Sequence, residues 1–196
     1  NIHKSVMEVM KKAVSVYDLD LELLISIKPD FIITQDLCDV CAVSFEQVEQ
    51  ACQEVLDKNI RIISLKPKML DDIWDDVQNV ADQLSVKEKG REFHEEKESR
   101  IKVLQTRCRD GIAPKVLTIE WIDPIYIGGM WLPEMIGIVG GEVCIAESGQ
   151  PAPVVNQEDL EKIEPDVVVI KPCGYKLEQT LKELELLKKQ LPDWEK

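Results

Sequence analysis

Two ten-residue stretches decide the fold: LISIKPDFII at residues 24–33 and LEKIEPDVVV at residues 160–169. Each indicates the end of a short helix, a Pro-Asp turn and an apolar strand, because the residue before a proline disfavours helical backbone. Uninterrupted apolar runs of this length are typical of parallel strands buried on both faces. The repeated pattern therefore predicts two similar α/β lobes, although Pro-Asp turns before strands are also common chemistry in unrelated chains.

Between the two stretches lies a polar segment, residues 86–107, with few apolar anchors. A helix of this length spans about 30 Å at about 1.5 Å per residue. It shows no sustained heptad, which argues against a coiled coil. We therefore expect an α/β fold with mainly parallel sheets, divided into a first lobe at 1–85, a connecting helix at 86–110 and a second lobe at 111–196.

Hydrophobic periodicity and capping residues predict the remaining elements. Helices are expected at 5–16, 19–27, after Ser44, and at 70–84, 133–139, 156–163 and 175–191. Strands are expected at 31–34, 60–65, 116–121, 143–146 and 167–170. Neither lobe has a full set of elements, since no strand precedes the first helix and only PDWEK follows the last one. We therefore expect a chain that is shortened at both ends.

Composition, charge and the absence of known motifs argue against several classes of function. The 196 residues are 44% apolar and 31% charged, which is typical of a folded globular chain. A formal net charge of -13 disfavours nucleic acid as a partner, because that role needs a broad basic surface. No apolar run approaches the roughly 20 residues of a membrane span, and no signal peptide is visible. Motifs of serine hydrolases, phosphate-binding loops and zinc proteases are absent, so we expect neither an enzyme nor a catalytic cofactor or metal.

In open parallel sheets, ligands bind outside the carboxyl ends of the strands. The loops expected there are residues 35–43, 122–130, 147–155 and 171–175. The first contains Cys38 and Cys41, whose spacing suits a structural loop pair, a ligand contact, or redox or metal chemistry. In the second, Trp121 and Trp131 bracket two glycines, which suits a large flat ligand, with core packing as the alternative.

Two longer stretches carry a family resemblance: KPDFIITQDLCDVCAV at 28–43 and EWIDPIYIGGMWLPEM at 120–135, the latter followed by Gly140-Gly141. They resemble the cobalamin-binding branch of the periplasmic iron-siderophore/vitamin B12 binding proteins, the substrate-binding components of ABC importers. The similarity runs through nearly the whole chain in order. It implies the class III fold, with two Rossmann-like lobes joined by one long helix. It also implies capture of a corrinoid, such as cobalamin, in the cleft between the lobes.

The resemblance assigns roles to individual residues. It implies ligand contacts from Gln35, Asp36, Cys38, Cys41, Trp121, Tyr126, Trp131 and Pro153. It implies docking onto the importer permease by Glu46 or Glu49 in the first lobe and Glu158 in the second. Ala152 departs from the family, whose members often place an aromatic side chain there.

The resemblance also implies a periplasmic or cell-surface location, although the absence of a signal peptide in this chain leaves a cytoplasmic location open. Two alternatives remain for the function. One is siderophore or haem binding in the same cleft, and the other is a redox or metal-handling protein centred on Cys38 and Cys41.

Overall fold

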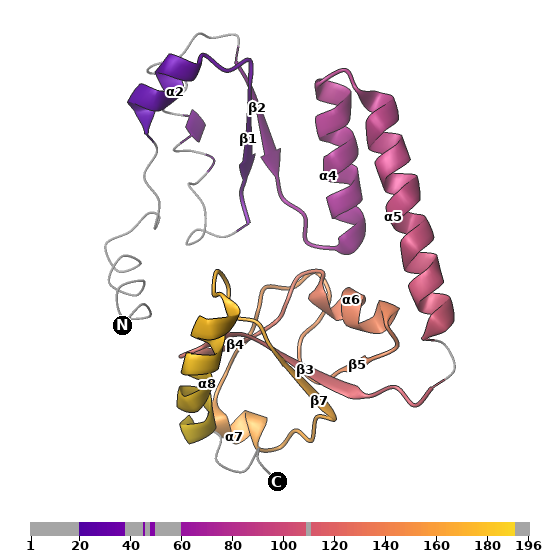
Figure 1. Cartoon of the computed structure of the whole chain (residues 1–196), viewed down its shortest axis with the longest axis vertical. Helices are drawn as coiled ribbons and strands as arrows, with labels where there is room; N and C mark the ends of the chain where they lie inside the picture. Colours follow the sequence, from indigo (N-terminus) through magenta and orange to yellow (C-terminus); the bar gives the residue numbers. More distant parts are fainter. Residues whose placement is uncertain (1–19, 38–44, 46–47, 50–59, 109–110, 191–196) are drawn as a thin grey trace. The chain divides into compact units, whose positions relative to one another are not determined.

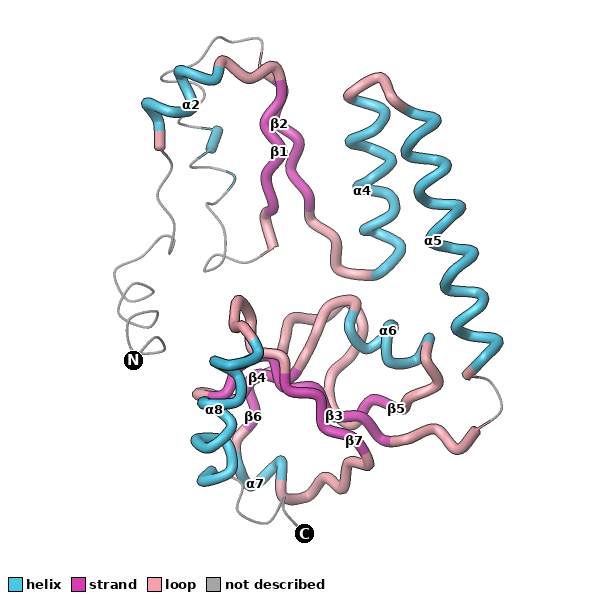
Figure 2. Tube along the Cα trace, in the orientation of Figure 1, coloured by secondary structure: helices cyan, strands magenta, loops and turns pink. Residues whose placement is uncertain are grey.

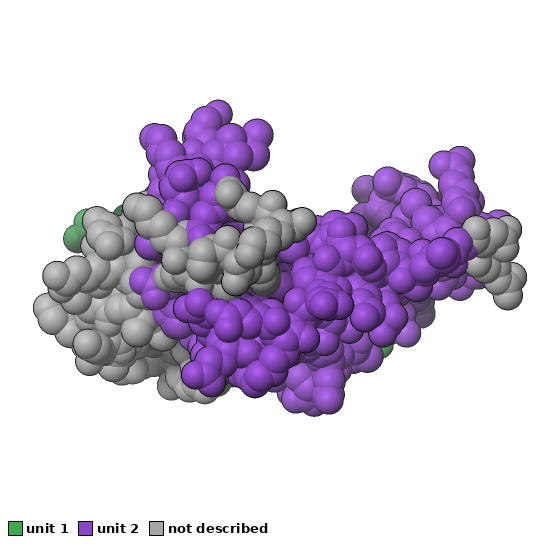
Figure 3. Space-filling view, turned by 90° about the horizontal axis from the view of Figure 1, so that it is seen from below, with its two compact units in different colours: residues 1–67, 75–86 green, residues 68–74, 87–196 purple. Residues whose placement is uncertain are grey.

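The computed structural model describes residues 20–37, 45, 48–49, 60–108 and 111–190 (Figure 1). The chain forms two compact units: residues 1–67 with 75–86, and residues 68–74 with 87–196 (Figure 3). Helices alternate with strands in both units, so the predicted α/β class is confirmed (Figure 2). The expected lobe boundaries stay a prediction. The expected helices at 5–16 and after Ser44 lie largely outside the described residues.

The first unit contains α2 (Leu21–Ile27), β1 (Phe31–Gln35) and β2 (Arg61–Leu65). Helix α2 begins at Asp20, whose carboxylate accepts a hydrogen bond of 2.9 Å from the Leu23 N–H. It ends at Lys28, which adopts a left-handed conformation (φ 51°) directly before Pro29. The two strands pair in parallel, with Phe31 opposite Arg61. The first Pro-Asp stretch therefore folds as the sequence predicts.

The expectation that both Pro-Asp strands are buried on two faces is wrong. Ile33 of β1 is 48% exposed, and Val167 and Val169 of β7 (Val167–Ile170) are also exposed. Within the described chain, β1 pairs only with β2 and β7 only with β3, so each strand ends its sheet on one side. Alternate side chains of a strand point to opposite faces of the sheet, so Val167 and Val169 mark a face of β7 that the described elements leave largely uncovered.

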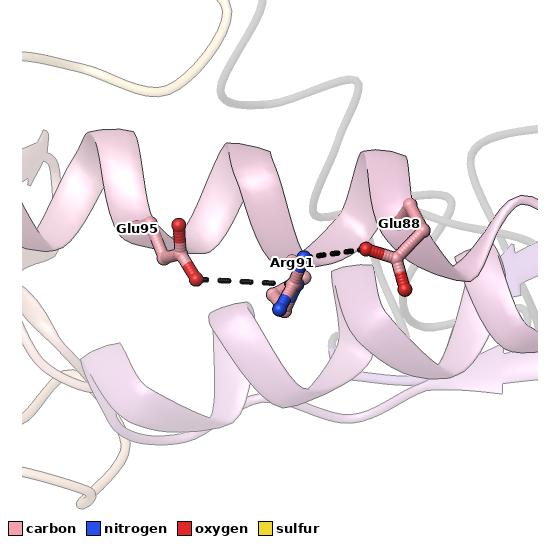
Figure 4. Close-up of polar contacts among 3 residues, drawn as sticks. All are labelled: Glu88, Arg91 and Glu95. Carbon is pink, nitrogen blue, oxygen red and sulfur yellow. Dashed lines mark hydrogen bonds and ion pairs between the residues drawn. The ribbon is translucent and has the colours of Figure 1, made fainter.

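Helices α4 (Leu70–Gln83) and α5 (Lys87–Arg107) match the expected helices at 70–84 and 86–107. The chain turns between them at Ser85 (φ 58°). Trp74 of α4 contacts the ring of Phe93 on α5, with 6.1 Å between the ring centroids. Helix α5 is strongly polar and carries ion pairs one turn apart, such as those of Arg91 with Glu88 and Glu95 (Figure 4). No described helix combines the length and the apolar character of a membrane span.

The sheet of the second unit is built around β3 (Lys115–Ile122). Strands β5 (Glu142–Val143) and β7 pair with it in parallel, with Val116 opposite both Val143 and Val167. Strand β4 (Ile125–Ile127) pairs with it antiparallel, and β6 (Val154–Val155) pairs antiparallel with β4. The expected parallel pairing is present around β3, and the chain reversal at Asp123-Pro124 adds an antiparallel hairpin where a loop was expected.

The core of the second unit lies between this sheet and the helices on one of its faces (Figure 1). These helices are α7 (Gln157–Leu160) and α8 (Leu177–Gln190), while α6 (Leu132–Ile138) lies on the other side of the sheet. Seven buried residues form the core cluster: Leu117, Ile119, Ile122, Ile125, Ile127, Leu160 and Leu187. Burying each aliphatic side chain stabilises the fold by about 1.5–3 kcal/mol. This packing holds the ends of the parallel strands at a defined edge.

Candidate ligand-binding site

The carboxyl ends of β3 and β7 form the edge where an α/β sheet binds ligands. Backbone hydrogen bonds continue past the last residue of β7, so the next residues follow β3 to its end. The Lys171 N–H donates to the Ile119 carbonyl (2.8 Å) and the Cys173 N–H donates to the Glu120 carbonyl (3.1 Å). The Lys171 ammonium also forms an ion pair with the Glu120 carboxylate. The loop after β7 is thus fixed beside the end of β3.

Trp121 lies at this edge and contacts an aromatic residue that the sequence did not single out, Tyr175. Their ring centroids are 5.4 Å apart and the planes are tilted by 57°, a favourable arrangement for aromatic pairs. The Trp121 indole N–H donates to the Asp123 carbonyl (3.0 Å). Burial, and to a lesser degree Glu183, raises the pKa of Tyr175 above the ordinary value of 10.0. Its place in the loop after a parallel strand is the signal that could have identified it.

Three other predicted residues, Tyr126, Trp131 and Pro153, lie on two backbone segments that are bonded together. Tyr126 of β4 is opposite Val154 of β6, and the Ile127 N–H donates to the Pro153 carbonyl (3.0 Å). The residue before Trp131 extends the contact, since the Met130 N–H donates to the Gln150 carbonyl (2.7 Å). All three predicted side chains are partly exposed. We call residues 126–131 and 149–153 together the aromatic corner.

Glycine is required in this corner. A Cβ atom on Gly129 would lie 2.5 Å from the Ala152 nitrogen and 2.7 Å from the Gln150 carbonyl oxygen. Both contacts are with backbone, which cannot move without opening the corner. Gly129, one of the two glycines between Trp121 and Trp131, is therefore a site of close backbone packing.

Glu134, the last residue of the Trp-Leu-Pro-Glu motif, has a further contact that the sequence did not indicate. It lies in the first turn of α6, as expected, where an acidic side chain suits the helix dipole. Its carboxylate also accepts a hydrogen bond of 2.6 Å from the Leu70 N–H at the start of α4. The N–H groups of Lys68 and Met69 donate to Asp72 (both 2.8 Å). Helix α6, which follows the first segment of the aromatic corner, and the start of α4 are thus joined within the second unit.

The predicted residues of the first unit are described only in part. Gln35 ends β1 and is exposed, while the Asp36 N–H donates to the Leu65 carbonyl (2.9 Å). The Asp36 carboxylate forms an ion pair with Lys66. Cys38, Cys41 and Glu46 lie outside the described residues, so their predicted roles stay predictions.

The remaining docking candidates, Glu49 and Glu158, are both exposed. Glu158 lies in the first turn of α7, where the Asn156 side chain accepts a hydrogen bond from the Asp159 N–H (2.9 Å). An acidic residue at this position also suits the helix dipole, so its placement has a structural reason beside the functional one.

A groove of about 490 Å³, open to solvent, is lined by Pro124, Ile125, Val154, Val155, Asn156 and Gln157.

Metal-ligating side chains do not gather in the described part of the chain: no group of three or more His, Cys, Asp or Glu residues there is placed to hold an ion. Cys108, Cys144 and Cys173 are free thiols, and burial raises the pKa of Cys144. His94 lies on α5, where its ring centroid is 6.3 Å from that of Trp74. The chemistry available at the edge of β3 and β7 is therefore aromatic and apolar contact with a few polar groups.

The fold of this chain is similar to that of several solved structures. IsdE of S. aureus, complexed with heme, superposes with a TM-score of 0.71 at 18% identity, covering 91% of this chain and 67% of that one. An ABC transporter substrate-binding protein of Listeria monocytogenes EGD-e gives 0.69 at 16% identity, with 87% and 64% covered. The periplasmic vitamin B12 binding protein BtuF of Vibrio cholerae gives 0.59 at 20% identity, with 89% and 68% covered.

These structures share the fold, and the chain spans about two thirds of the length of each. No curated protein matches the chain. The model of the periplasmic binding protein family matches residues 7–196, which is nearly the whole chain. The chain therefore belongs to the periplasmic binding protein family.

Proposed function

We propose that this protein is the non-catalytic substrate-binding component of an ABC importer, and that it captures a corrinoid such as cobalamin and releases it unchanged. The observation that carries the proposal is that Trp121 at the end of β3 lies opposite Tyr126 of β4, with Trp131 a few residues further along the chain, and that all three are partly exposed. Aromatic side chains offer broad apolar surface to a flat macrocycle. Family membership supports the transport role.

A corrinoid suits these loops because its cobalt already carries axial groups, so the protein needs to supply mainly shape and apolar surface. The chain has only two histidines, His3 and His94, and neither belongs to the loops at the edge of β3 and β7. Haem is the second candidate, because the iron can take Tyr or Met as an axial ligand. Tyr126, Met130 and Tyr175 place such side chains at this edge, and IsdE was solved with heme.

Delivery requires a partner, and we propose that exposed acidic residues dock onto basic residues of the importer permease. Glu49 and Glu158 are exposed, and Glu46 is the alternative to Glu49 in the first unit. The net charge of -13 favours attraction to a basic surface at low salt. The same proposal places the protein on the periplasmic or outer side of the membrane.

Titration of the full chain with cyanocobalamin tests the proposal. Corrinoids absorb where tryptophan emits, so saturable quenching of tryptophan fluorescence is expected, with free N-acetyltryptophanamide as the control for light absorption by the ligand. Haem is titrated in parallel as the alternative ligand, and its binding is followed by the shift of its Soret absorption band. Absence of saturable binding of cyanocobalamin at high micromolar concentration would overturn the corrinoid assignment. A Soret shift in that case would assign haem instead.

The redox or metal alternative needs Cys38 and Cys41. Replacing both with serine leaves ligand binding within about twofold if the pair closes a loop. A loss of bound metal or of a redox-active disulfide in the same variant would favour the alternative.

A further inference from the structure

Tyr175 is brought to the ligand-binding edge by a sequence of backbone contacts. After the chain follows β3 through Lys171 and Cys173, Gly174 adopts a positive φ of 75°. The Tyr175 N–H then donates to the Pro172 carbonyl (3.2 Å), which closes a tight turn. This turn places the phenol ring against the indole of Trp121, 5.4 Å between centroids. The position of Tyr175 is therefore set by backbone geometry as well as by side-chain packing.

The Trp121–Tyr175 pair is followed along the chain by apolar side chains that are exposed to solvent and do not pack into the core. Trp121 and Tyr175 are both partly exposed, and neither belongs to the buried core cluster. Helix α8 begins two residues after Tyr175 with Leu177, which is 71% exposed, and continues one turn later with the exposed Leu181. Apolar side chains left open at the carboxyl ends of parallel strands are typical of a binding surface.

We propose that Tyr175 is a ligand-contacting residue, and that Tyr175 and Trp121 together form an aromatic wall that packs against a flat, largely apolar macrocycle. This inference rests on the proposed function and names a residue that neither the sequence motifs nor the resemblance indicate. The indole N–H of Trp121 is bonded to the Asp123 carbonyl, so the wall is held in place before the ligand arrives. A preformed wall loses little conformational entropy on binding.

The neutral state of Tyr175 matters for this role. A tyrosine phenol carries no charge near neutral pH, and burial and then Glu183 raise the pKa of Tyr175 further, so the residue presents an apolar ring with one hydroxyl. The nearby Lys171 is ion-paired with Glu120. A flat apolar ligand can therefore approach the wall without meeting an unmatched tyrosinate.

Two variants and a footprinting experiment test the proposal in the full chain with cyanocobalamin as the probe. Tyr175→Ala removes the ring and is expected to weaken binding about tenfold or more. Tyr175→Phe keeps the ring and is expected to bind within about twofold of the wild type. Near-UV circular dichroism checks that both variants fold. Wild-type affinity in a folded Tyr175→Ala variant would overturn the proposal.

Hydroxyl-radical footprinting of the wild-type protein decides the question even where Tyr175→Ala fails to fold. Cyanocobalamin is expected to protect Tyr175 and Trp121 from oxidation, while Phe93 on α5 serves as an unprotected control. Protection of Trp131 without protection of Tyr175 would leave the proposed function standing and overturn the role of Tyr175. If the wild type binds haem instead, the same variants are titrated with haem. Binding of neither ligand would overturn both proposals.

Discussion

In each unit, an ion pair between a lysine and a carboxylate lies at the carboxyl ends of two paired parallel strands. The units differ in the aromatic contacts beside that ion pair. In the first, a lysine directly after β2, Lys66, pairs with Asp36 after β1. In the second, a lysine directly after β7, Lys171, pairs with Glu120 of β3. Only the second adds the Trp121–Tyr175 pair and the bonded loops of the aromatic corner among the described residues. The shared ion pair is part of the fold, whereas the added aromatic residues carry the specificity that we propose.

The two units should differ most in how much free energy of unfolding is lost when an apolar strand residue is replaced by alanine. Leu117→Ala removes a fully buried side chain from the core of the second unit and is expected to lower the free energy of unfolding by about 3 kcal/mol. Ile33→Ala, in the half-exposed strand of the first unit, is the matched variant and should cost clearly less. Urea unfolding followed by circular dichroism measures both. Equal costs would show that Ile33 is covered in solution.

The aromatic corner can be opened by one methyl group. Gly129→Ala forces a Cβ against the backbone of residues 150–152 and is expected to cost about 1–3 kcal/mol and to weaken ligand binding. Gly137→Ala in α6 is the control, because its Cβ would meet nothing within 4 Å. Because Gly137 is the next-to-last residue of this helix, that change should leave stability equal or raised by less than about 1 kcal/mol. Calorimetric Tm values and ligand titrations measure both variants, and a neutral Gly129→Ala would contradict the close packing.

Asp72, at the start of α4, should make the free energy of unfolding depend on pH in the acidic range. The pKa of Asp72 is lowered by the N–H groups of Met69 and then Lys68, so its carboxylate is more acidic in the folded chain than the ordinary value of 3.8. A lowered pKa contributes stability that is complete above about pH 4 and is lost as pH falls through the folded value. Asp72→Asn should therefore flatten the decline of the urea midpoint below pH 4. An unchanged pH profile in that variant would contradict the two backbone hydrogen bonds.

Removing the ion pairs Lys66–Asp36 and Lys171–Glu120 should change the free energy of unfolding least, and by similar amounts in the two units. Both pairs are partly exposed, and such pairs contribute about 0–1 kcal/mol. Lys66→Met and Lys171→Met are each expected to lower the free energy of unfolding by less than about 1 kcal/mol, and less still in 0.5 M salt. Urea unfolding at two ionic strengths measures this. A much larger loss in Lys171→Met alone would show that the pair helps to hold the loop before Tyr175.

Local signals in the sequence predicted much of the fold. The Pro-Asp turns, the cap at Asn156 and the long polar helix follow from residue chemistry within a few positions. Strands β4 and β6 were missed because three and two residues give no readable alternation, and their pairing depends on partners far along the chain.

Contacts of the candidate site were missed for the same reason. Tyr126, Trp131 and Pro153 were named by resemblance, and nothing local shows that their loops are hydrogen-bonded together. The Trp121–Tyr175 contact depends on the parallel register of β3 and β7, and the Glu134–Leu70 bond joins residues 64 positions apart. A single sequence carries no direct record of such long-range contacts.

The bond between Glu134 and Leu70 bears on how this protein can be divided for experiments. Residues 68–74 belong to the second unit although most of α4 belongs to the first. A recombinant fragment that starts at residue 87 would lack Leu70, the hydrogen-bond donor to Glu134, and Met69, whose sulfur packs at Gly149. A fragment that starts at residue 68 keeps both contacts, and it carries all of α4 with it.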